Sequence, residues 1–208
     1  MRTRPQGVSP PLSSASKPSV DFIKDRLRHA ADASLATADR EADAIATAAA
    51  LVARTFHAGG KLLLCGNGGS AADCQHLAAE FVSRLTNDFD RPALPAIALT
   101  TDSSYLTGYA NDFGFDGVFA RQIDALGAAG DALLAISTSG ASRNILAAVE
   151  AARRKRLVVV ALLGEDGPLA QAADVAVRVP SRDTQVIQQV HLAIEHLICH
   201  LVERAMYP

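Results

Sequence analysis

His76 and Glu80 lie four residues apart, and Arg84 follows four residues later. If this segment is helical, the three side chains share one face of the helix. An imidazole beside a carboxylate suits proton transfer or metal binding. The same spacing is also common in solvent-exposed surface pairs. The pair therefore predicts a site only if other chemical groups are brought close to it.

A glycine-rich turn comes directly before this pair. Residues 62–64 are a short apolar run without polar alternation, which is typical of a strand buried on both faces of a parallel sheet. Residues 66–70, Gly-Asn-Gly-Gly-Ser, break the run, and a helix is predicted over residues 71–84. A loop at a helix N-terminus offers backbone N–H groups to an anion. The pattern is neither a P-loop, because no Gly-Lys-Ser/Thr follows, nor a dinucleotide fingerprint.

A second loop of the same kind lies downstream. Residues 137–142, Ser-Thr-Ser-Gly-Ala-Ser, follow the apolar strand predicted over 131–136 and precede a helix predicted over 143–154. Their four hydroxyls and the N–H groups of the helix start suit a phosphate monoester without a metal. Because ligands gather at the carboxyl ends of parallel strands, we expect both loops to form one phosphate site.

Composition limits the classes of partner. The chain has 208 residues, 49% of them hydrophobic, and a net charge of −2 without a dense basic run, so neither nucleic acid nor an anionic membrane is an expected partner. The three cysteines lack Cys-x-x-Cys spacing and indicate a reducing compartment. Residues 1–19 are rich in Pro and Ser and have no apolar signal region, so we expect a disordered tail and a cytoplasmic protein.

Strand and helix patterns alternate along the rest of the chain. They predict an α/β fold, a three-layer αβα sandwich with a five-stranded parallel sheet, in one domain over residues 20–208. Two alanine-rich helices before the first strand are expected to serve as an oligomer interface. The further strands are predicted over 96–99, 157–163 and 175–179, and the helices over 20–34, 38–57, 103–109, 117–126, 169–173 and 184–206.

The two loops, residues 65–70 and 136–142, resemble the signature loops of the sugar isomerase (SIS) domain family, and most closely those of the phosphoheptose isomerases. Residues 100–102, residues 111–115 and the Gln188/His191/His196 pattern belong to the same resemblance, which covers residues 20–208. It implies an aldose–ketose isomerase that converts D-sedoheptulose 7-phosphate to D-glycero-D-manno-heptose 7-phosphate through an enediol(ate), the first step of nucleotide-activated heptose synthesis. It also implies a homotetramer.

The resemblance further implies the roles of individual residues. Glu80 and His196 match the acid/base pair, and we expect Glu80 to take the C1 proton of the ketose. One zinc ion per subunit would be held by His76, Glu80, Gln188 and His196. A zinc-bound Glu80 would be less basic, so its two expected roles conflict. The sugar phosphate would be bound by Asn67, Gly68, Gly69, Ser70, Glu80, Asn111, Asp112, Ser137, Thr138, Ser139, Ser142 and Gln188.

Several alternatives remain open from the sequence. On the C-terminal helix, periodicity alone does not separate Gln188 and His196 from the nearby His191, Glu195 and His200. One alternative function is a non-catalytic SIS-fold scaffold of the replication-initiator-associating type, although the full set of acid/base residues argues against it. Another is an isomerase of a different sugar phosphate in specialised metabolism, because phosphate loops carry no information on sugar chain length.

Overall fold

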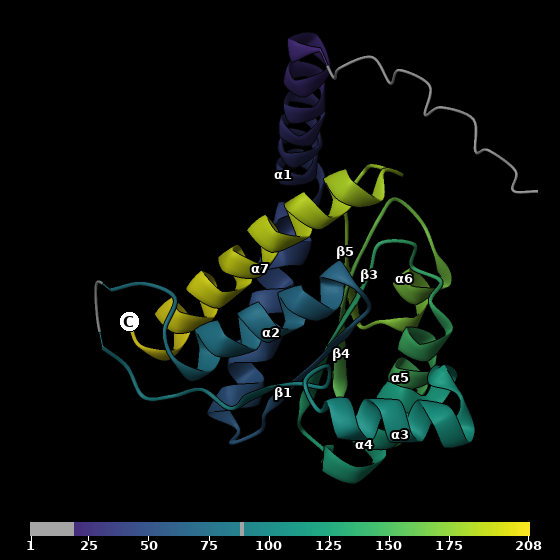
Figure 1. Ribbon diagram of the computed structural model, residues 1–208. Coiled ribbons are helices and arrows are strands. Elements are labelled where there is room, and N and C mark those ends of the chain that lie inside the picture. The colour runs from purple at the N-terminus through teal and green to yellow at the C-terminus, as the bar shows by residue number, and fades with distance from the viewer. Residues whose placement is uncertain (1–18, 88–89) are drawn as a thin grey trace, which may run out of the picture.

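The computed structural model describes residues 19–87 and 90–208, so most of the tail expected over 1–19 lies outside the described residues. Within this range the chain forms one five-stranded, fully parallel sheet in the order β2-β1-β3-β4-β5 (Figure 1). The predicted fold class is confirmed. The strands are β1 (Leu62–Gly66), β2 (Ala96–Ala98), β3 (Ala132–Ser137), β4 (Val158–Leu163) and β5 (Val175–Arg178). The helices are α1 (Val20–His57), α2 (Gly69–Val82), α3 (Ser103–Phe113), α4 (Val118–Leu126), α5 (Arg143–Arg154), α6 (Pro168–Ala172) and α7 (Thr184–Met206), with a 3₁₀ turn over Phe115–Gly117.

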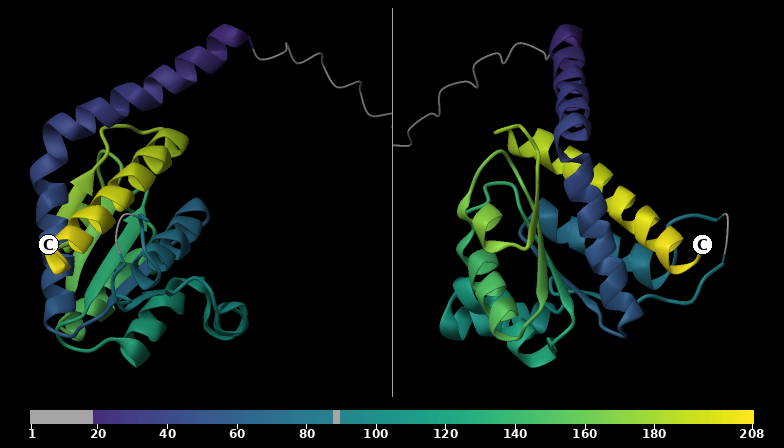
Figure 2. Two further views of the ribbon diagram at one scale, coloured as in Figure 1. Left: turned by 90° about the vertical axis from the view of Figure 1, so that its left-hand side faces the viewer. Right: turned by 180° about the vertical axis from the view of Figure 1, so that it is seen from behind.

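Helices cover both faces of the sheet (Figure 2). Leu62 and Leu64 of β1 point into a core shared with α1, α2 and α7, whereas Leu63 and Cys65 point into a second core shared with α4, α5 and α6. All of these strand side chains are fully buried. A strand buried on both faces has no reason to alternate polar and apolar residues, which explains the continuous apolar runs of the sequence.

The N-terminal segment is one helix, not two. α1 runs without a break for 38 residues from Val20 to His57. The expected interruption near residues 34–38 was wrong: no Gly or Pro stands there, and the local hydroxyls bond back to helix carbonyls, which can bend a helix without breaking it. Ser34 Oγ donates to the Ala30 carbonyl at 3.0 Å, and Thr37 Oγ1 donates to the Ala33 carbonyl at 2.8 Å.

α3 is also longer than predicted. It continues through Asn111 and Asp112 and ends at Phe113, where Gly114 adopts a positive φ of 87°. The helix was expected to end at residue 109, but Asn and Asp are tolerated in the last turn of a helix and Gly supplies the reversal that ends it. None of the residues of α3 is buried.

The strand order places both loops at one point of the sheet. β1 pairs with β2 on one side and with β3 on the other, so the chain runs outward in opposite directions from the β1–β3 pair. Ligands of open parallel sheets bind outside the carboxyl ends of the strands at such a switch point. The Gly loop after β1 and the Ser/Thr loop after β3 both begin there.

Two further observations concern membrane spans and cysteine reactivity. Among the described residues no helix is long and apolar enough to cross a membrane. All three cysteines, Cys65, Cys74 and Cys199, are buried free thiols. Burial raises the pKa of the Cys65 and Cys74 thiols well above the ordinary value and that of Cys199 to about 12. None of them is therefore a reactive thiolate at neutral pH.

Candidate active site

The Gly loop (residues 66–70) joins β1 to α2 in a turn that side chains would block. A Cβ on Gly66 would lie 2.6 Å from the Ser70 carbonyl oxygen, and Gly68 has a positive φ of 56°. Both positions therefore require glycine. α2 begins at Gly69 without a side-chain cap, which leaves first-turn N–H groups available to an anion.

The Ser/Thr loop (residues 137–142) is organised by its own hydroxyls. Ser137 Oγ lies 3.4 Å from Ser139 Oγ and donates to Ser142 Oγ at 3.2 Å, while the Ala141 N–H donates to Ser139 Oγ at 3.2 Å. Ser142 is the N-cap residue of α5 but makes no side-chain cap bond. The loop therefore presents clustered hydroxyls and a helix start, the chemistry that a phosphate needs.

One residue pair joins the two loops. Asn67 donates to Asn144 Oδ1 at 2.9 Å, and Asn144 returns a bond to Asn67 Oδ1 at 2.8 Å. This reciprocal amide pair spans the β1–β3 switch point. Asn144, which is buried in the first turn of α5, was missed from the sequence because its partner lies 77 residues away. The pair therefore links the Gly loop to the first turn of the helix that follows the Ser/Thr loop.

The acid/base candidates converge from α2 and α7. His76 Nε2 lies 2.8 Å from His196 Nε2, so one ring donates its N–H to the other, and the two rings meet edge to face. Glu80 Oε1 lies 3.7 Å from Nδ1 of His76. The Glu80 side chain is 19% exposed and that of His76 is 43% exposed. Three predicted site residues are thus within reach of one another and of solvent.

Asp73, which the sequence analysis did not identify, holds the Gln188 side chain in place. The Nε2 of Gln188 donates to both carboxylate oxygens of Asp73, at 3.2 and 3.4 Å, which leaves the amide oxygen free to contact a ligand. Burial raises the pKa of Asp73, although the Gln188 bond and His76 oppose that rise. The Gln188 amide also fills the space next to Gly69, where a Cβ would overlap it. Gly69 therefore brings the Gly loop against α7.

Asn111 and Asp112 lie apart from the other predicted site residues. Both are exposed on the last turn of α3, and Asn111 donates to Asp112 at 2.9 Å. Asp112 lines a hollow of about 560 Å³ whose wall includes Tyr105 and Tyr109. In the part of the chain that the structure describes, no hydrogen bond or ion pair joins these two residues to the loops. Their predicted role in substrate binding remains a prediction.

Two of the alternative residues on α7 face the interior. His191 and Glu195 are both 0% exposed, and His191 Nε2 lies 3.1 Å from the Leu163 carbonyl oxygen. Burial lowers the pKa of His191 to about 4, which the Leu163 carbonyl opposes. Burial, with the nearby charge of Asp73, raises the pKa of Glu195 to about 9. Both are buried and uncharged at neutral pH. His200 is exposed, but of the α7 imidazoles it is His196 for which a contact with His76 is found.

The donor set fits zinc in its chemistry and partly in its geometry. Zinc prefers imidazole nitrogen and carboxylate oxygen, and catalytic sites keep an open position. His76 and His196 already present one nitrogen each to the other. Gln188 instead contacts Asp73, and no group of three or more His, Cys, Asp or Glu side chains among the described residues is arranged to hold a metal. Completing the site would need side-chain movements of Glu80 and Gln188.

Known proteins of one family match this chain over most of its length. Residues 27–164 match the model of the SIS domain. The chain is 46% identical over 197 residues to a phosphoheptose isomerase of Roseiflexus sp. (strain RS-1), an alignment that covers 94% of this chain and 99% of the relative. A phosphoheptose isomerase structure from Neisseria gonorrhoeae superposes with a TM-score of 0.83 at 39% identity over 88% of this chain and 98% of that one. One from Francisella tularensis gives 0.85 at 39% identity over 89% and 98%.

Proposed function

The chain belongs to the phosphoheptose isomerases of the SIS-domain family, and we propose how its residues carry out that reaction. It is an aldose–ketose isomerase acting on D-sedoheptulose 7-phosphate, which it converts to D-glycero-D-manno-heptose 7-phosphate. The observation that carries the residue assignment is the 2.8 Å approach of His76 to His196 beside Glu80, next to two loops suited to phosphate. Proton transfer and phosphate binding are what this isomerisation requires.

We propose that the phosphate of the substrate binds between the two loops. The N-termini of α2 and α5 both lack side-chain caps, so their free N–H groups and helix dipoles favour the dianion. Ser137, Thr138, Ser139 and Ser142 supply hydroxyl donors, and the Asn67–Asn144 pair fixes the distance between the loops. Binding at the phosphate end orients the sugar carbons toward α2 and α7.

In the proposed chemistry Glu80 removes a proton from C1 of the ketose. The electrons of that C–H bond form the C1=C2 bond of the enediol(ate), and charge develops on O2. His196 donates its N–H proton to O2, with His76 as the neighbour that fixes the orientation of its ring. Return of a proton to C2 and loss of the O1 proton complete the aldose. One carboxylate and one imidazole on opposite helices suffice for both transfers.

We propose a zinc ion as the cofactor, held by His76, Glu80, Gln188 and His196; the substrate would displace Glu80 from the metal, which would free its carboxylate to act as the base. When bound, zinc would polarise the substrate carbonyl. The bond from Gln188 Nε2 to Asp73 supports this assignment because it leaves the amide oxygen, the only zinc donor of that side chain, free to bind the metal. Elemental analysis of the purified protein should find about one zinc per chain, reduced at least several-fold in His76→Ala. An equal zinc content in the two proteins would remove His76 as a ligand.

We propose that the protein assembles as a homotetramer through α1 and α7. The first half of α1 extends beyond the sheet in every view (Figures 1 and 2) and exposes Val20, Phe22, Ile23, Leu27 and Leu35, each between 52% and 66%. On α7, next to His196, Leu197 is 51% exposed. Exposed apolar side chains gathered on one helix favour association with other protein surfaces. Light scattering of the full chain tests the assembly, and a monomer at micromolar concentration would exclude it.

The function is tested by following sedoheptulose 7-phosphate by NMR in D₂O, with zinc supplied. The wild type should form the aldose and exchange deuterium into C1, and Glu80→Gln should do neither. Glu150→Gln is a matched control, because Glu150 is an exposed carboxylate on α5. Full activity of Glu80→Gln would remove Glu80 as the base. No turnover by the wild type would favour a different sugar phosphate or a non-catalytic scaffold.

A further inference from the structure

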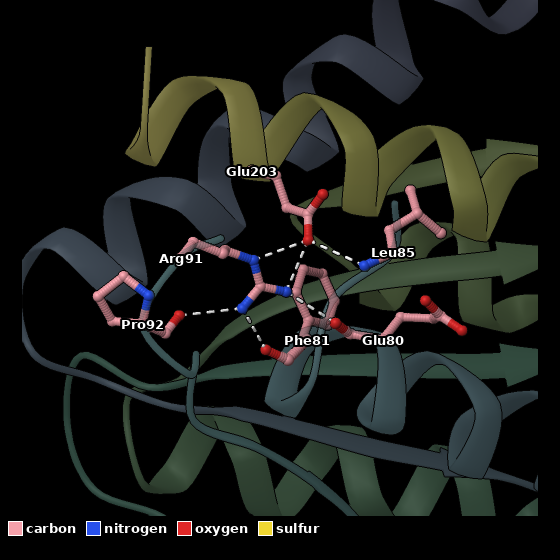
Figure 3. A network of polar contacts seen from close by, with 6 residues as sticks. All are labelled: Glu80, Phe81, Leu85, Arg91, Pro92 and Glu203. Atoms are coloured by element: carbon pink, nitrogen blue, oxygen red, sulfur yellow. Dashed lines mark hydrogen bonds and ion pairs between the residues drawn. The ribbon is translucent and has the colours of Figure 1, made fainter. Parts of the chain in front are cut away.

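A buried ion pair lies under the last turn of α2 (Figure 3). Arg91 belongs to the segment that leads from α2 to β2, and Glu203 is on α7. Arg91 Nε and Nη2 each lie 2.7 Å from Glu203 Oε1. The two side chains are only 0% and 2% exposed. A buried ion pair is weak evidence for a stabilising role, because apolar residues of similar volume are often as stable or more so.

The two terminal nitrogens of Arg91 also donate to backbone oxygens, those of Pro92 (from Nη1, at 3.0 Å) and of two residues at the end of α2. Nη2 donates to the Glu80 carbonyl at 2.7 Å, and Nη1 donates to the Phe81 carbonyl at 2.8 Å. The last carbonyls of a helix have no partner within the helix, so this guanidinium takes the place of a C-terminal cap. Glu203 also accepts the N–H of Leu85, just beyond the helix, at 3.1 Å. The pair therefore fixes the turn that carries Glu80.

Besides the Gln188–Asp73 bond, α2 and α7 are linked on each side of the Glu80 side chain. One link is the His76–His196 contact, and the other runs from the Glu80 carbonyl through Arg91 to Glu203. Glu203 is seven residues after His196 and lies on nearly the same face of α7, about 10 Å along its axis. The Glu80 side chain starts between these two links. Its position relative to His196 depends on both.

We propose that Arg91, paired with Glu203, is a positioning residue for the isomerisation: it fixes the rotation and the distance of the α2 C-terminal turn relative to α7, so that the Glu80 carboxylate stays in place for proton transfer. This inference rests on the proposed role of Glu80. Arg91 contacts the backbone of Glu80 and not the substrate, so its loss should lower kcat and leave phosphate binding intact.

The main test is the double exchange Arg91→Met with Glu203→Gln. It leaves no unpaired buried charge, and the Gln oxygen can still accept the Leu85 N–H. We expect kcat to fall by about 10- to 100-fold with KM changed less than about threefold, because a small misplacement of a catalytic group has costs of this size. C1 deuterium exchange should slow by the same factor as product formation.

A second ion pair supplies the matched control. Lys61 Nζ pairs with Asp131, whose side chain is 4% exposed, at the amino ends of β1 and β3. Lys61→Met with Asp131→Asn removes a buried charge pair far from Glu80 and should leave kcat within about twofold. A loss of kcat in this control equal to that in the Arg91 variant would mean a general stability effect and would overturn the inference.

A single exchange, Arg91→Lys, covers the case in which the double variant does not fold. Lysine keeps the positive charge for Glu203 but lacks the planar fork that also reaches two carbonyls, so kcat should still fall about tenfold. Wild-type kcat in Arg91→Lys or in the folded double variant, with Glu80→Gln inactive, would overturn the positioning role and leave the proposed function intact. An active Glu80→Gln would remove both the role of Glu80 and the inference that rests on it.

Discussion

The Ser/Thr loop and the α2–α7 helix pair do different parts of the proposed reaction, and they are built in different ways. The loop is six residues long and its hydroxyls bond to one another. The helix pair brings His76 to His196 across 120 residues of sequence and depends on packing and on the Arg91–Glu203 link. The Ser/Thr loop is therefore a local feature of the chain, whereas the proposed acid/base geometry depends on the whole fold.

The largest expected effect separates these two regions most clearly. In His196→Gln the side chain keeps a donor but loses the titratable imidazole, so kcat should fall by about 10²- to 10⁴-fold. KM should stay nearly unchanged, because the phosphate loops are intact. Steady-state kinetics with the same sugar phosphate measures both. A large increase in KM with normal kcat would mean that His196 binds the substrate and does not move a proton.

Gly69→Ala tests the contact between the Gly loop and Gln188 of the helix pair. The new Cβ would overlap the Gln188 amide, which is the end of a flexible side chain, so the fold should survive while Gln188 moves. We expect kcat/KM to fall by about 10²-fold. Gly108→Ala on α3 is the control, since no atom lies within 4 Å of its Cβ, and it should stabilise the helix by about 0.5–1 kcal/mol with normal activity. Equal kinetics in the two variants would contradict the Gly69–Gln188 contact.

Ser142→Ala tests the loop side of the comparison. Removing one hydroxyl from a site with several other donors should raise KM about tenfold and change kcat little, because one net hydrogen bond to a charged group is worth about 1.5 kcal/mol. Competition by inorganic phosphate should weaken by a similar factor. If kcat falls instead and phosphate competes normally, the loop acts on the reacting carbons and not on the phosphate.

The smallest expected effect on turnover belongs to His191, the buried histidine of α7. Its pKa is depressed from about 6.5 to about 4, so between these pH values the unfolded chain binds a proton that the folded chain does not. Its neutral form therefore contributes stability above pH 6.5 that is lost as the pH falls to 4, by up to about 3 kcal/mol. His191→Gln should show less acid destabilisation in thermal unfolding between pH 7 and 4.5, with normal kcat at pH 7. An unchanged pH dependence of unfolding, or a large loss of kcat, would contradict this role.

How well each feature could be predicted depends on whether its residues are close together in the sequence. The five strands and the bounds of α5 and α7 followed from apolar runs and periodicity, and both loops were found because their residues are consecutive. Asp73, Asn144 and the Arg91–Glu203 pair were missed because each acts through a partner 77 to 115 residues away. No local pattern marks a buried arginine whose partners are helix-end carbonyls. The break expected in α1 was wrong because no Gly or Pro stands near residues 34–37, and the hydroxyls there bond to helix carbonyls, which can bend the helix without ending it.

The exposed half of α1 has a consequence for how the folded state responds to concentration. Residues 20–35 would extend over about 24 Å as a helix, a length that is only marginally stable by itself in water. Within one chain this segment forms an ion pair between Arg26 and Asp183 at 2.7 Å, but most of its large apolar side chains are exposed. In the proposed assembly the missing cover comes from other subunits, so folding of this segment is governed by mass action. The unfolding temperature should then rise with protein concentration, and dilution alone should loosen the N-terminal helix before the sheet beneath it.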